Sequence, residues 1–324
     1  MRALIWVTVL LGALWAGIWW FASGAALQGA QALIDGSDGQ VSAADVSVSG
    51  FPNRVDLTLT EVTLKGPDQS WTAPFLQVFA MTWKPWQLIG VLPPGSQLRT
   101  PSQDITLNGT KMRGSATLTP TKDLALSDAI VEGHGLELSS TLGWQVTAEG
   151  LFGAAQEDLT QKNGYRVGLT LRNIGFDTTM AQSLSSLGLP QVLAQIHLDA
   201  KAVMSSPLDR FSGQSNPRIE TLGITDLSFD WGTAKGSIVG DLLSGTDGFA
   251  EGELRIHVQD WRKVLALGVL FDALTQDQAD ILGRGFAEIA KGAADNETID
   301  VTLTAEGGLI YFGALPIGPA PRLR

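Results

Sequence analysis

The residues that could carry chemistry are few and scattered along the 324-residue chain. There is no cysteine, which excludes a thiolate metal site, a thiol nucleophile and a disulfide framework. His197 and His257 stand between apolar neighbours, so the alternation of a strand places both on its polar face. His134 lies between two glycines, a pattern typical of a kink or a bulge. None of the three histidines is expected to bind a metal.

Catalytic motifs are missing as well. The sequence has no GxSxG nucleophile elbow, no GxxxxGK[ST] phosphate loop and no HExxH helix. Gly283-Arg284-Gly285 begins like a dinucleotide fingerprint, but it lies in a predicted helix and lacks the third glycine. The carboxylates are spread singly, so spacing alone leaves a carboxylate-only hydrolase open. We expect a protein that is not an enzyme and that uses no metal or cofactor.

Composition narrows the class of protein further. The 22 basic and 33 acidic residues give a net charge of −11, which argues against nucleic acid as a partner. Hydrophobic residues make up 44% of the chain, enough to bury a sizeable core. Charged residues account for only 17%, where about 25% is usual, and 37 glycines favour strands and turns over helices.

The N-terminus predicts a membrane anchor. Residues 3–22 carry no charge, and as a helix they span roughly 30 Å, the thickness of a bilayer hydrocarbon core. Arg2 precedes them and Arg54 is the first basic residue afterwards, so the positive-inside bias keeps the N-terminus in the cytoplasm. The helix is expected to continue to about Ile34. The anchoring side chains are Leu4, Ile5, Trp6, Leu10, Leu11, Leu14, Trp15, Ile18, Trp19, Trp20 and Phe21, of which the last three suit an aromatic belt at the outer interface.

A cleaved signal peptide is the alternative interpretation of this segment. Ser23-Gly24-Ala25 and Gly24-Ala25-Ala26 are passable small-residue cleavage sites. However, the apolar segment is longer than the about 7–15 residues of a signal peptide, and a single basic residue precedes it. The sequence therefore favours an uncleaved anchor over residues 1–35, followed by one domain over residues 36–324.

Strand alternation dominates the rest of the chain. Arg54–Thr60 alternates strictly, and the apolar series then changes phase at Val62, which predicts a β-bulge near Thr60-Glu61. The same alternation returns to the C-terminus, so we expect a mainly β fold with a long, curved antiparallel sheet. Its apolar face either stays open as a groove or closes as a sandwich core. The candidate lining residues are Val55, Leu57, Leu59, Leu169, Leu171, Leu227, Phe229, Leu254 and Ile256.

Helical patterns interrupt the strands in two places. Thr178–Leu193 is a weak candidate, whereas residues 261–292 predict two helices. The second of these begins with Thr275-Gln276-Asp277-Gln278, which has the pattern of a capping box. We expect both to pack on the sheet, with the second helix burying a stripe formed by Ile281, Leu282, Phe286 and Ile289.

Four segments carry a family resemblance: VSVSGFPNRVDL at residues 46–57, WKPWQLI at 83–89, GELRIHVQDW at 252–261 and GALPIGPAPRL at 313–323. Together they resemble the alphaproteobacterial family catalogued as domain of unknown function 2125, over nearly the whole chain. More distantly the chain is similar to the AsmA-like envelope proteins. That similarity implies a bacterial inner-membrane anchor followed by a long curved sheet in the periplasm, and a role in lipid or outer-membrane homeostasis.

Two functions follow as hypotheses. In the first, the protein binds or moves phospholipid, or another apolar ligand, through an apolar β groove. Its physical basis is that many strands present an apolar face while only two helical stretches can cover them. In the second, the protein is an accessory or scaffold of an envelope complex, with other envelope proteins as partners and no ligand. Co-purification of phospholipid with the protein distinguishes the two.

Overall fold

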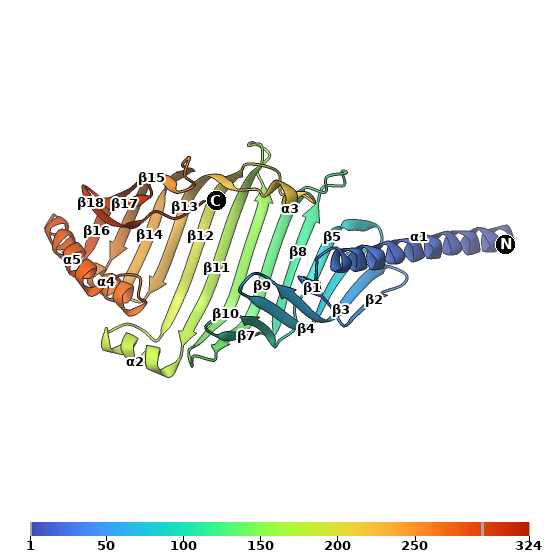
Figure 1. The fold of residues 1–324 in the computed structure, drawn as a ribbon, viewed down its shortest axis with the longest axis horizontal. Helices are drawn as coiled ribbons and strands as arrows, with labels where there is room; N and C mark the ends of the chain where they lie inside the picture. The colour runs from blue at the N-terminus through green and yellow to red at the C-terminus, as the bar shows by residue number, and fades with distance from the viewer. Residues whose placement is uncertain (1, 293–294, 324) are drawn as a thin grey trace. The chain divides into compact units, whose positions relative to one another are not determined.

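The computed structural model describes residues 2–292 and 295–323. Within them the protein is mainly β, with eighteen antiparallel strands and five helices, the first of which is a long apolar helix at the N-terminus (Figure 1). This confirms the predicted fold class. The chain divides into two compact units, Met1–Gln145 (unit 1) and Val146–Arg324 (unit 2). The predicted boundary after residue 35, between anchor and domain, stays a prediction.

Unit 1 begins with helix α1 (Arg2–Asp35), which is uninterrupted (Figure 1). The predicted end at about Ile34 is correct to one residue, and the Gly36 amide donates to the carbonyl of Ala32 at 2.9 Å as the chain turns away. The helix contacts β1 (Val41–Ser42), β2 (Asp45–Ser49) and β3 (Arg54–Lys65).

The remaining strands of unit 1 form a sheet in which two short strand pairs replace single long strands at its centre. They are β4 (Ser70–Met81), β5 (Lys84–Val91), β6 (Ser96–Arg99), β7 (Asp104–Asn108), β8 (Lys111–Leu118) and β9 (Leu126–Ser140). Strand β3 pairs with both β1 and β2 on one side and with β4 on the other. The two short pairs β5–β8 and β6–β7 then lie between β4 and β9.

The predicted β-bulge in β3 is wrong, although the backbone is irregular at the predicted position. Glu61 has a positive φ of 51°, but the register between β3 and β4 is the same before it, at Thr60–Phe75, and after it, at Val62–Ala73. No residue is inserted. The register places Glu61 opposite Pro74, which has no N–H to donate, so the ladder is interrupted at this point without a shift.

Unit 2 is a meander in which each strand pairs with the next along the chain. Its strands are β10 (Gln145–Glu157), β11 (Gly164–Phe176), β12 (Val192–Met204), β13 (Ile219–Trp231), β14 (Ala234–Ser244), β15 (Ala250–Gln259), β16 (Thr298–Glu306), β17 (Leu309–Phe312) and β18 (Leu315–Pro319). Four short helices complete it: α2 (Thr178–Ser186), α3 (Ser212–Ser215), α4 (Trp261–Leu270) and α5 (Gln276–Ala290).

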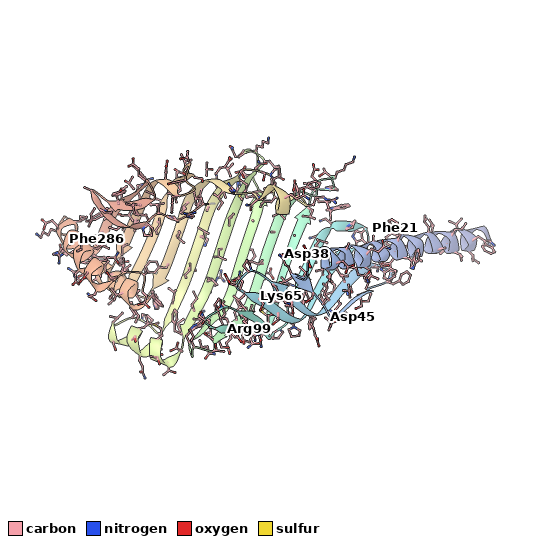
Figure 2. All side chains as sticks on the ribbon, viewed as in Figure 1. Phe21, Asp38, Asp45, Lys65, Arg99 and Phe286 are labelled. Carbon is pink, nitrogen blue, oxygen red and sulfur yellow. The ribbon has the colours of Figure 1, made fainter. Side chains whose placement is uncertain are left out.

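The helical predictions are correct except for the end of the first helix and the buried stripe of α5. The predicted helix Thr178–Leu193 ends at Ser186, and Leu193 lies in β12. The capping box is present, because the Thr275 hydroxyl accepts from the Gln278 amide and the Gln278 side chain accepts from the Thr275 amide. Leu282 is buried and Phe286 (labelled in Figure 2) packs in the core, as predicted. Ile281 and Ile289 instead remain 43% and 39% exposed. Each lies one step of about 100° away from the true stripe. That stripe is Ala279, Leu282, Phe286 and Ala290.

The buried core of unit 2 includes two clusters at different places on the sheet. Under α4 and α5, the cluster includes Val258, Trp261 and Ile299. The second includes Leu242, Ala250 and Ala320, and it lies under the C-terminal residues 320–323. There the Ala250 amide donates to the Pro321 carbonyl at 2.8 Å.

Candidate apolar site and membrane anchor

The strand register of unit 2 aligns apolar side chains in rows across the sheet. One row runs from β11 to β16 through residues paired in sequence: Leu169, Leu198, Leu227, Ile238, Ile256 and Val301. The next row is Leu171, Ile196, Phe229, Gly236, Val258 and Ile299. Directly opposed residues of adjacent strands share a face, so this face of the sheet is apolar over six strands.

The opposite face of unit 2 is polar, as strand alternation predicts. His197 and His257 lie on it, each beside a polar partner on the neighbouring strand. His197 Nδ1 is 3.1 Å from the Thr170 hydroxyl, and His257 Nδ1 is 2.8 Å from the Asp300 carboxylate. The sheet of unit 2 therefore has one wet face and one face that needs a cover.

Helix α4 covers part of the apolar face and leaves a cavity beneath it. The cavity has a volume of 530 Å³, within the range of ligand pockets in proteins. Ser228 and Ser237 are the polar residues of its lining, and the others are apolar or glycine. They are Leu193, Ile196, Leu227, Phe229, Trp231, Gly236, Ile238, Ile256 and Val258 from the sheet, and Val264, Leu267, Gly268, Phe271 and Ala273 from α4 and the turn after it.

Glycine at position 236 shapes the floor of this cavity. Gly236 is paired directly with Phe229, and a Cβ at 236 would lie 2.4 Å from Cε1 of the Phe229 ring. Such a contact is impossible, so glycine lets the ring lie flat across the neighbouring strand. A larger residue would push the ring from its place.

Aromatic rings close one side of the cavity. Trp231 is buried and its indole N–H donates to the Pro190 carbonyl at 2.8 Å. Phe176 stacks on Trp231 at 5.5 Å, and Phe271 of the cover contacts both rings at 5.8 and 6.1 Å. Because the Trp231 N–H is already bonded, this wall presents only ring surface to the cavity.

The predicted groove residues separate into three groups. Leu227, Phe229 and Ile256 line the cavity. Leu169 and Leu171 continue the same two rows on β11 but do not line the cavity, and Leu254 packs instead with the cluster under the C-terminal residues. Val55, Leu57 and Leu59 belong to unit 1, where Val55 and Leu59 are buried and Leu57 is half-buried.

The sequence predicts that helices pack on the sheet, but the lining residues of α4 and Ile196 of the floor were not among the predicted groove residues. Ile196 is the apolar neighbour of His197, and the alternation that places His197 on the polar face places Ile196 on the apolar face. Val264, Leu267 and Phe271 follow the spacing of three or four that marks the inner stripe of a helix. Nothing local to the sequence shows that this stripe faces β12–β15.

Most apolar side chains in the first half of α1 are exposed, in keeping with a membrane-spanning segment. The helix is long and apolar enough to cross a bilayer. The predicted anchor residues Ile5, Trp6, Leu10, Leu11, Leu14, Ile18, Trp20 and Phe21 are all exposed. Phe21 is labelled on the helix in Figure 2. Trp15 and Trp19 are half-buried against unit 1, and the side chain of Leu4 lies outside the described residues.

The family model described as "Uncharacterized protein conserved in bacteria (DUF2125)" matches residues 19–321. The chain belongs to this family. In this DUF2125 protein the match begins within α1 and extends through both units, so it takes in the whole cavity. Searches of curated proteins and of solved structures find no match to the chain.

The titratable side chains of the DUF2125 chain lie outside the lining of the cavity. Among the residues that the structure describes, no three His, Asp or Glu side chains gather as a metal site. The carboxylate with the largest described perturbation is Asp158, in the β10–β11 turn, where hydrogen bonds from Thr160 and the Arg166 guanidinium lower its pKa to about 2. A carboxylate so stabilised is held in its charged form and suits a structural role.

Proposed function

We propose that this protein is anchored in the bacterial inner membrane, with its N-terminus in the cytoplasm and its sheet in the periplasm, and that it binds phospholipid or another apolar ligand. The apolar cavity between β12–β15 and α4 is the observation that carries the proposal. A cavity with almost no polar group in its wall suits an acyl chain, because a polar ligand would lose its hydrogen bonds with water there. In this proposal the protein acts by binding and not by catalysis.

The position of the chain in the membrane supports the same function. A lipid-handling protein gains from being tethered to the source of its ligand, and α1 supplies such a tether. We place the protein with the AsmA-like envelope proteins as part of this proposal, on the similarity of an N-terminal anchor followed by an antiparallel sheet. Support of envelope or outer-membrane homeostasis is the biological role that we infer.

A scaffold without a ligand is the second candidate. The observation that favours it is the burial of Leu193, Trp231 and Leu267, which line the cavity and also behave as ordinary core residues. In that case the space under α4 is a loosely packed core, and the partners of the protein are other envelope proteins.

Filling the cavity tests the proposal. Ile238→Trp places a large ring in the cavity, whereas Val239→Trp makes a similar change on the next residue of β14, on the opposite face. If the protein binds lipid here, phospholipid that co-purifies with the full-length protein, measured by mass spectrometry, falls for Ile238→Trp and not for Val239→Trp. Equal lipid in both variants, or none in the parent protein, would contradict ligand binding in this cavity and favour the scaffold.

A further inference from the structure

The anchor helix does more than tether unit 1, because two of its tryptophans hold the β2–β3 loop. The Trp15 indole donates to the Pro52 carbonyl at 2.8 Å, and the Trp19 indole donates to the Arg54 carbonyl at 2.5 Å. The Trp19 ring also meets the Phe51 ring edge-on at 5.4 Å. The loop is thus bonded to α1 at two heights, one helical turn apart.

These contacts fix the height of the loop against the predicted membrane span. Trp15 lies seven residues before residue 22, where the span is predicted to end, which is about 10 Å along a helix. A loop bonded to Trp15 therefore lies at the level of the outer part of the bilayer whenever α1 spans it. At this depth an indole N–H and a backbone carbonyl lack water partners, so each satisfies the other.

The exposed residues of the loop are of types that favour contact with lipid. Phe51 and Trp83, the latter in the turn between β4 and β5, are each 57% exposed. The two loops are joined, because the Thr82 amide donates to the Asn53 carbonyl at 3.1 Å. Phe51, Pro52 and Asn53 carry no charge, and the adjacent Arg54 is paired with the Asp56 carboxylate at 2.6 Å. Exposed aromatic residues favour the interface between headgroups and acyl chains.

Gly50 holds the turn that presents this surface. Its φ is +102°, and a Cβ there would lie 2.8 Å from the Arg54 carbonyl oxygen and 2.9 Å from Cγ of Asp56. Only glycine fits this conformation and this space. The segment Gly50-Phe51-Pro52 is therefore shaped to project Phe51 beside α1.

We propose that the tips of the β2–β3 and β4–β5 loops, with Phe51 and Trp83, insert into the outer leaflet of the lipid bilayer, and that Trp15 and Trp19 set their depth. The occupant of this surface is the bilayer itself, continuous with the lipid around α1. The proposal rests on the membrane anchoring proposed above and is independent of the ligand cavity.

Depth measurement in vesicles tests this insertion. The chain has no cysteine, so Asn53→Cys and, as control, Leu142→Cys each create a single labelling site in the full-length protein. Leu142 is 65% exposed and lies in the loop between β9 and β10 of unit 1. In phosphatidylethanolamine–phosphatidylglycerol vesicles that contain nitroxide-labelled lipid, a fluorophore at position 53 should be quenched several-fold more strongly than one at 142.

Carbonate extraction of the same vesicles separates the two proposals. Weak quenching at 53, in protein that resists extraction, overturns the insertion but leaves the anchor intact. Weak quenching in protein that is extracted overturns both.

Removal of the indole donors tests how the depth is set. Trp15→Phe with Trp19→Phe retains aromatic rings but loses both hydrogen bonds, so quenching at position 53 should fall toward that at 142. Trp6→Phe is the matched control on the exposed part of the same helix. Unchanged quenching in the double variant overturns the positioning role of Trp15 and Trp19.

Discussion

At the scale of single residues, hydrogen bonds stabilise the charged form of the Asp158 carboxylate. Asp158 Oδ1 accepts from the Thr160 amide at 3.0 Å and from its hydroxyl at 2.6 Å, while Oδ2 accepts from the Arg166 guanidinium at 3.3 Å. These bonds join the two sides of the β10–β11 turn. They favour the carboxylate, so the pKa of Asp158 falls from its ordinary value to about 2.

This lowered pKa makes a prediction about acid stability. Because the folded pKa lies below that of the unfolded chain, Asp158 stabilises the fold above about pH 4. That contribution is lost as the pH falls from about 4 through about 2. In Asp158→Asn, denaturation midpoints measured by circular dichroism should vary less with pH across this window than those of the parent. Asp199→Asn, on the exposed face of β12, is the control for loss of a carboxylate without these hydrogen bonds. Parallel curves of midpoint against pH for the parent and Asp158→Asn would contradict the prediction.

At the scale of elements, α4 and α5 cover part of the apolar face of unit 2. A cavity lies under α4, and a buried core cluster lies beside it. Trp261 of α4 meets Phe286 of α5 edge-on at 5.9 Å, and Phe286 meets Phe312 of β17 at 5.5 Å. The cover is therefore held to the sheet by a chain of aromatic contacts. We therefore expect that a substitution that destabilises α5 also lowers the stability of this part of unit 2.

The N-cap of α5 offers a measurement of that contribution. Thr275→Ala removes the hydroxyl that accepts from the Gln278 amide and should destabilise the protein by about 1 kcal/mol. Thr178→Ala is the matched control, because Thr178 also begins a helix but the N-cap of α2 is Asp177. Chemical denaturation should show a lower midpoint for Thr275→Ala only, and equal midpoints in the two variants would show that the cap contributes nothing measurable.

At the scale of the whole molecule, one helix is long and apolar enough to anchor the sheet-bearing chain in a membrane. Leu11 and Leu33 lie on this helix and are equally exposed, at 61%. Only Leu11 belongs to the predicted span of residues 3–22. A charge in the bilayer centre costs roughly 2.5–3.5 kcal/mol on insertion scales, so the two positions should respond differently to the same substitution.

Leu11→Arg should reduce membrane insertion, measured as resistance to carbonate extraction, while Leu33→Arg should insert like the parent. If both variants insert equally, residues 3–22 are not the spanning segment.

Reporter fusions give the orientation of the same helix. A phosphatase that is active only in the periplasm should be active at the C-terminus, whereas a reporter that is active only in the cytoplasm should be silent there. The reverse pattern would invert the proposed topology.

Local sequence patterns are enough to predict several features of this fold. The uncharged run predicts α1, strict alternation predicts the strands and their polar and apolar faces, and Thr275–Gln278 predicts the start of α5. Each rests on a period of two or 3.6 residues, or on a cap within one turn, so neighbours in the chain are enough to specify it.

Which of these faces meet depends on contacts that appear only in the folded chain. Leu169, Leu227 and Ile256 share a row because the register between strands aligns them, and α4 encloses a cavity because its inner stripe falls on that row. Asp56 shows the same limit, since alternation places it on a polar face, yet it is buried beside Gly50 and paired with Arg54. Register, cover and burial arise from contacts between residues far apart in the chain, and side-chain periodicity carries no information about such contacts.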